Sequence, residues 1–145
     1  MPPTKKSDGF SAEERAAMKE RAEELRAEGK KGAKKADGLQ AVLDAIEKMA
    51  PEDRAIAERL HVVVTTNAPQ LAPKTWYGMP AYAKDGKIVV FFKPASKFES
   101  RYATLGFEEA AQLDDGDMWV TSYALVELGD AEAKKITALV KKAAG

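Results

Sequence analysis

Hydrophobic residues recur at helical spacing in three stretches in the first half of the chain. The first stretch runs from Ala12 to about Glu28, and its start matches a capping box, in which Ser11 and Glu14 each bond the other's backbone amide. Its apolar stripe is thin and consists of Met18, Ala22 and Leu25. We therefore predict a charged helix that ends at Gly29 and docks on a neighbour without forming a core.

Two further helices are expected to bury a full apolar face. The stripe of the first is Leu39, Val42, Leu43, Ile46 and Met49. The second begins near Pro51 with acidic residues in its first turn, and its inner face is Ile56, Leu60, Val63 and Val64. Residues 62–66 are rich in β-branched side chains and suit a strand as well, but the unbroken helical period favours a helix that ends before Pro69.

After Pro73 the hydrophobic period changes toward two, which is typical of strands. We expect short strands at residues 75–78 and 81–83 on either side of Pro80. Asp85-Gly86 predicts a hairpin turn before a strand at residues 87–93. Further strands are expected at residues 100–105 and 118–127, with a short helix or turn at 107–113 and a turn at 114–116.

The chain ends with a predicted helix that Asp130 caps and whose stripe is Ile136, Leu139 and Val140. The order of these elements predicts an α+β fold, in which an antiparallel sheet packs against helices. Helices come first, hairpin-linked strands follow, and a helix comes last. Residues 1–37 are expected to comprise a disordered tail, the charged helix and a basic linker at 29–37. Residues 38–145 are expected to form the α+β domain.

Composition narrows the function classes. Lys and Arg number 23, as do Asp and Glu, and the chain of 145 residues contains no Cys. Disulfides, thiolate metal sites and Cys nucleophiles are thereby excluded. The first ten residues carry no apolar segment typical of a secretory signal, and no stretch is apolar enough to span a membrane. We therefore expect a cytoplasmic protein.

No catalytic motif stands out. The chain lacks a nucleophile elbow, a phosphate-binding loop and a dinucleotide fingerprint. His61 is the one His, and we interpret it as a structural or surface residue of a helix. A Ser–His–acid catalytic arrangement could be composed from Ser100 or Ser122 with His61, but nothing local activates either hydroxyl. We assign no catalytic residue and no cofactor.

Aromatic residues concentrate between Trp76 and Phe107, which hold eight of the eleven in the chain. Core packing explains most of them, yet both faces of the strand at 87–93 are apolar, so a ligand pocket or a dimer contact is an alternative for one face. Aromatic surface edged by cations would suit a small molecule with an anionic group. The predicted ligand-binding residues are Trp76, Tyr77, Tyr82, Lys97, Arg101, Tyr102 and Trp119.

Two charged runs have functional alternatives. The acidic run consists of Glu108, Glu109, Asp114, Asp115 and Asp117. Such carboxylates could bind a hard cation, although we favour a solvated turn with acids at the start of a short helix. The basic run at residues 26–35 could touch nucleic-acid phosphate, but it has no interleaved aromatic residues for base stacking. We interpret it as a solubilising linker and expect no nucleic-acid partner.

Several motifs together resemble the YdhG-like family of uncharacterised domains. They are Trp76-Tyr-Gly-Met-Pro-Ala-Tyr82, Asp85-Gly-Lys87 and Phe91-Phe-Lys-Pro-Ala-Ser-Lys-Phe98. Arg101-Tyr-Ala-Thr-Leu-Gly-Phe107 and Leu113-Asp-Asp-Gly-Asp-Met-Trp119 look like the actinobacterial-type branch. The resemblance extends from about Leu39 to Ala144, and the helix at 12–28 resembles an extension of that branch.

This resemblance implies a strongly curved antiparallel sheet packed on helices, with an N-terminal helical extension. One branch of the family is labelled a frataxin-like iron chaperone, which implies iron bound by exposed carboxylates. Phe98 stands where many relatives have a His, so a plausible iron ligand is missing here. Our first hypothesis is a non-catalytic domain, monomeric or dimeric, that binds a small molecule or a protein. The alternative is iron binding through the acidic run.

Overall fold

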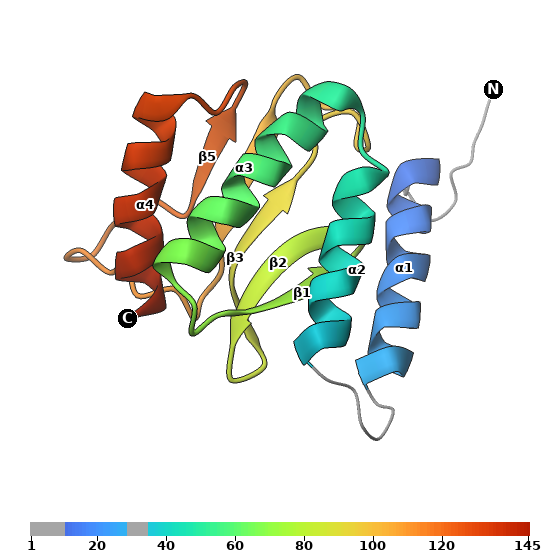
Figure 1. Ribbon diagram of the computed structural model, residues 1–145, viewed down its shortest axis with the longest axis horizontal. Coiled ribbons are helices and arrows are strands. Elements are labelled where there is room, and N and C mark those ends of the chain that lie inside the picture. Colours follow the sequence, from blue (N-terminus) through green and yellow to red (C-terminus); the bar gives the residue numbers. More distant parts are fainter. Residues whose placement is uncertain (1–10, 29–34) are drawn as a thin grey trace.

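The computed structural model describes residues 11–28 and 35–145. This part of the chain forms four helices and five strands (Figure 1). The helices are α1 (Ala12–Glu28), α2 (Lys35–Glu47), α3 (Pro51–Asn67) and α4 (Asp130–Ala144). The strands are β1 (Ala72–Trp76), β2 (Met79–Lys84), β3 (Lys87–Lys93), β4 (Ala103–Phe107) and β5 (Ser122–Leu125). The predicted α+β class is confirmed.

The strands form one antiparallel sheet in which each strand pairs with its neighbours in the sequence, in the order β1-β2-β3-β4-β5. Helices α2, α3 and α4 lie over the same face of this sheet (Figure 1). Helix α1 lies beside α2, at the β1 side of the sheet, and contacts β1. It is therefore an N-terminal extension of the helical layer.

The core lies between the sheet and its helices. Phe92 pairs with Leu105, and Val90 pairs with Phe107, so these four side chains share the face that the helices cover. All four are buried against residues of α2, α3 and α4. Burying the apolar face of each element removes it from water, which is the main force that holds the layers together.

The opposite face of the sheet is aromatic at its centre. Phe91 pairs with Gly106, and an added Cβ at residue 106 would run into the Phe91 ring. Trp76 packs edge-on against Phe91, with ring centroids 5.3 Å apart. Because Gly106 has no side chain, the Phe91 ring can lie directly over it.

Several local predictions are confirmed. The helix at 12–28 begins with the expected capping box, in which Ser11 N donates to Glu14 Oε1 (2.9 Å) and Glu14 N donates to Ser11 Oγ (3.0 Å). Residues 62–66 are helical within α3. The β2–β3 hairpin turns at Asp85 and Gly86, whose φ angles of 52° and 80° suit the twist of the adjoining strands.

Other local predictions were wrong. The first hairpin turns at Tyr77 and Gly78, and Pro80 lies inside β2. The strand expected at 100–105 begins only at Ala103 and extends to Phe107. Of the short helix or turn expected at 107–113, the structure has the turn, at residues 109–110. The long strand expected at 118–127 is reduced to β5, and residues 118–121 and 126–127 lie outside the strand.

The cap of the last helix also differs from the prediction. Gly129 is the N-cap residue of α4, and its amide donates to Glu132 Oε1 (2.9 Å). Asp130 instead forms an ion pair with Arg59 of α3 (Nη2–Oδ1, 2.6 Å), which lowers the pKa of the Asp130 carboxyl. This carboxylate links two helices rather than capping its own.

Part of the expected N-terminal organisation lies outside the described residues, namely the tail at 1–9 and the linker at 29–34. The remaining linker residues, 35–37, belong to α2, so the boundary expected at 37/38 falls inside that helix. Within residues 11–28 and 35–145, no helix combines the length and the apolar character that a membrane span requires.

Candidate functional site

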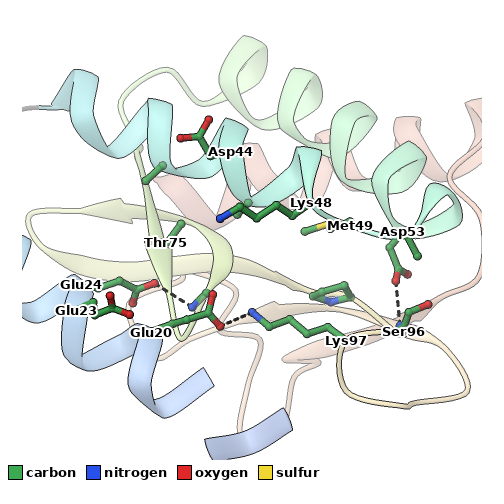
Figure 2. A pocket seen from close by; sticks show the side chains of 15 residues that line it. Glu20, Glu23, Glu24, Asp44, Lys48, Met49, Asp53, Thr75, Ser96 and Lys97 are labelled. Atoms are coloured by element: carbon green, nitrogen blue, oxygen red, sulfur yellow. Dashed lines mark hydrogen bonds and ion pairs between the residues drawn. The ribbon is translucent and has the colours of Figure 1, made fainter. Parts of the chain in front are cut away.

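A groove of about 590 Å³ lies between α1 and α2 and extends to the start of α3 (Figure 2). The β1–β2 turn and the loop after β3 complete its walls. Its apolar lining is Ala41, Ala45, Met49, Ala50 and Pro94. Its charged lining is Glu20, Glu23, Glu24, Asp44, Asp53, Lys48 and Lys97. Among these described residues, carboxylates outnumber lysines by five to two, so the groove is acidic.

Glu24 joins α1 to the β1–β2 turn. Its Oε1 accepts from Tyr77 N and its Oε2 accepts from Gly78 N, each at 2.9 Å. Both turn residues have positive φ (54° and 77°), and this conformation directs successive amides at the same carboxylate. Arg21 adds an ion pair to Glu24 at 3.4 Å. The side chain of Glu24 is only 10% exposed, so these donors replace water around its charge.

Glu20, one helical turn before Glu24, binds the loop after β3. Its Oε1 lies 2.7 Å from Lys97 Nζ. The pair sits directly over Gly78, where an added Cβ would run into both the Lys97 ammonium and the Glu20 carboxylate. Gly78 is therefore required by its left-handed backbone and by the close approach of this ion pair.

Asp53 closes the far end of the groove. It lies in the first turn of α3, is 4% exposed, and accepts from the amides of Ala95 (3.1 Å) and Ser96 (2.9 Å). The positive end of the helix dipole further stabilises its negative charge. This carboxylate fixes the loop that carries Lys97.

The remaining charged side chains of the groove are available to a ligand. Asp44 accepts from Gln40 (2.9 Å) and keeps further acceptor capacity. Glu23 and Lys48 make no side-chain hydrogen bond or ion pair with any residue that the structure describes. Asp44 and Lys48 lie on the α2 wall, and Glu23 lies on the α1 wall (Figure 2).

The predicted aromatic site residues are distributed over different parts of the fold. Trp76 packs edge-on against Tyr77 and Phe91, with ring centroids 5.3 Å apart in each case. Trp76 also lines a second groove of about 390 Å³, together with Lys87, Ile88, Glu108 and Glu109. Tyr82 is 1% exposed and lies on the helix-covered face of the sheet, because strand alternation places it opposite Trp76. Trp76 and Tyr82 therefore do not share a pocket.

The other predicted ligand residues are also separated. Lys97 lines the α1–α2 groove and is paired with Glu20. Arg101 lies over the ring of Tyr102 (5.1 Å to the centroid), and both side chains are exposed. Trp119 lines a third groove, of about 380 Å³. The cations and aromatic rings expected to hold one anionic ligand thus lie in several places.

Three of the five acidic residues of the predicted metal site share that third groove, namely Glu108, Glu109 and Asp114. Asp115 and Asp117 are exposed in the turn beyond it. Within the described part of the chain, no three His, Cys, Asp or Glu side chains come together as a metal-binding group. Iron binding through the acidic run stays a prediction from the family resemblance.

Sequence reasoning missed the carboxylates that build the α1–α2 groove. One signal was present, since Glu20 and Glu24 are four residues apart on a helix with few apolar residues. Such a helix docks largely through polar contacts. Asp53 gave no comparable signal, because its partners at 95 and 96 are more than forty residues away in the sequence.

Comparison with known proteins returned no match: no family model, no curated protein and no solved structure matches this chain.

Proposed function

We propose that this protein is a non-catalytic binding domain whose α1–α2 groove holds a small organic cation. The observation that carries the proposal is the lining of the groove, in which five carboxylates face two lysines around an apolar floor. A groove of about 590 Å³ is within the range of small-molecule sites. Its lining of carboxylates and apolar side chains suits an amine on a short aliphatic chain.

The charges of the groove favour a cation over the anion expected from the sequence. Lys97 is already neutralised by Glu20 at 2.7 Å, which leaves Lys48 as the one lysine of the described lining with no ion pair. Glu24 is paired with Arg21 as well as with two amides, whereas Asp53 is stabilised by backbone amides, which leave its negative charge in place. Glu23, Asp44 and Asp53 therefore outnumber Lys48 among the remaining charges of the described lining. The local potential is therefore negative and attracts cations.

Two carboxylates with unused acceptor capacity supply the specific contacts. Glu23 on α1 and Asp44 on α2 face the groove from its two walls (Figure 2). An ammonium group that binds there would form charge-assisted hydrogen bonds, which are stronger than bonds between neutral groups. The aliphatic part of the ligand would cover Ala41, Ala45 and Met49 and remove apolar surface from water.

Membership of the YdhG-like family and a cytoplasmic location remain part of the proposal. The motifs from Trp76 to Trp119 support the first, and the lack of Cys is compatible with the second.

Isothermal calorimetry with three matched four-carbon probes tests the proposal. The probes are 1,4-diaminobutane, the neutral 1,4-butanediol and the dianion succinate. We expect the diamine alone to bind and to raise the melting temperature. At a hundredfold excess over Kd the stabilisation is about 2.7 kcal/mol. The proposal is overturned if no organic cation in a wider panel of amines binds. It is also overturned if the diamine and the diol bind equally well.

Two substitutions place the binding in the groove. Glu23→Gln and Asp44→Asn each remove one free carboxylate while keeping its shape, and each is expected to weaken diamine binding about tenfold. Glu47→Gln is the matched control, because Glu47 is an exposed acid of α2 that does not line the groove. A loss with Glu47→Gln equal to that with Asp44→Asn would show a non-specific charge effect and reject the groove.

A further inference from the structure

We infer that the β1–β2 turn and Lys97 form a docking surface for an acidic helix, which α1 occupies within the chain and a partner's helix can occupy in its place. The surface consists of the amides of Tyr77 and Gly78, the Tyr77 ring and the Lys97 ammonium. Glu20, Glu24, Gly78 and Lys97 also line the groove, but the inference concerns which helix docks there and does not depend on ligand binding.

The contacts of α1 define what this surface recognises. Glu24 spans two consecutive amides, and Glu20 reaches Lys97 from one turn earlier. Between them, Arg21 lies over the Tyr77 ring at 5.9 Å and pairs with Glu24. The recognised pattern is therefore Glu-Arg-x-x-Glu on one helical face, with two carboxylates four residues apart.

The geometry of this surface suits a carboxylate. Tyr77 and Gly78 hold their positive φ angles because the hairpin requires them, and the Tyr77 ring is packed edge-on against Trp76. Two amides that point outward from such a turn make an anion-binding concavity. Lys97 is held beside it by the loop that Asp53 anchors.

Helix α1 is suited to being exchanged because little apolar surface holds it. Among residues 12–26, Ala17 is the one buried side chain, while Met18 and Leu25 are 37% and 52% exposed. Its contacts with the turn and loop are polar, and water can solvate these charged groups when α1 leaves the surface. By contrast, α2 and α3 contribute Val42, Ile46 and Leu60 to the core.

The test uses the full chain and synthetic peptides of residues 11–28. In the Glu20→Gln/Glu24→Gln protein, α1 should release the surface, so the amide resonances of Tyr77 and Gly78 should move in ¹H–¹⁵N NMR spectra. Adding the native peptide should then return both resonances toward their wild-type positions in a saturable way. A peptide with Gln at 20 and 24 should bind at least about tenfold more weakly, because charge-assisted bonds to the amides and Lys97 are lost.

Two controls define the outcome. Glu23→Gln alone should leave the Tyr77 and Gly78 resonances in place, because Glu23 does not contact the turn. Adding Lys97→Gln to the double variant should weaken binding of the native peptide.

The inference is overturned if the double variant keeps the wild-type resonances, if both peptides bind equally, or if neither binds at millimolar concentration. It is also overturned if the wild-type resonances change on dilution, because the surface would then be filled by α1 of a second copy. Diamine binding is measured separately, so each proposal can fail alone.

Discussion

The imidazole of His61 and the phenol of Tyr82 form a hydrogen bond, with His61 Nδ1 and Tyr82 Oη 2.7 Å apart. His61 belongs to α3 and Tyr82 to β2, so the bond joins the helical layer to the sheet. Burial raises the pKa of the Tyr82 hydroxyl and lowers the pKa of His61. Both side chains are therefore neutral at pH 7.

This relationship predicts that stability falls in mild acid. The pKa of His61 is lower in the folded state than its ordinary value of 6.5, so the unfolded chain binds the proton more tightly. The free energy of unfolding should therefore be constant above the unfolded pKa and decrease as pH falls from about 7 toward the folded pKa. Urea titrations from pH 8 to 5 should show a larger decrease for the wild type than for His61→Gln. Parallel curves for the two proteins would contradict the prediction.

Removing the Tyr82 hydroxyl should cost stability without altering the fold. Tyr82→Phe keeps the ring in the core but breaks the bond to His61, and we expect a loss of about 1 kcal/mol in the free energy of unfolding. Tyr102→Phe is the control, because Tyr102 is 38% exposed and should show almost no change in urea unfolding. Equal effects of the two substitutions would show that the bond contributes nothing.

Asp53 should be more important for stability than its neighbour Glu52. An Asn at 53 can accept from one of the amides at 95 and 96 but presents its NH₂ group to the other, so Asp53→Asn should cost about 1–3 kcal/mol. Glu52→Gln changes an exposed acid in the same helical turn and should cost less than about 1 kcal/mol. Chemical denaturation of both variants measures the difference, and a larger loss with Glu52→Gln would refute this role for Asp53.

Gly106 and Phe91 should be energetically coupled. Gly106→Ala places a methyl group in the space of the Phe91 ring and should destabilise the fold by about 1–3 kcal/mol. Combining it with Phe91→Leu should relieve part of that cost, with a coupling energy of at least about 0.5 kcal/mol in a double-mutant cycle.

Gly86→Ala provides the control for this cycle. A Cβ at 86 meets no neighbour, so its cost comes from the backbone alone, at φ = 80°. That cost should be the same with Phe or Leu at 91. Strict additivity of Gly106→Ala and Phe91→Leu would contradict the contact.

The amino-acid sequence by itself determined the elements whose signals are local. The capping box at Ser11 and Glu14, the helical period through residues 56–66 and the Asp85-Gly86 turn each involve residues within a few positions of one another. Local hydrogen bonds and side-chain periodicity are sufficient for such features. The Asp85-Gly86 turn, followed by a run of β-branched and aromatic residues, likewise placed residues 87–93 in a strand of an antiparallel sheet.

The tertiary structure alone decided which face each aromatic residue joined and which charges met. Trp76 and Tyr82 are close in sequence, yet the β1–β2 pairing sends them to opposite faces, and Tyr82 finds His61 only through the packing of α3. Lys97 meets Glu20 across 77 positions because α1 docks beside the hairpin. These contacts depend on the path of the chain between distant segments, and no local pattern encodes that path. The groove and its negative charge are consequences of that docking.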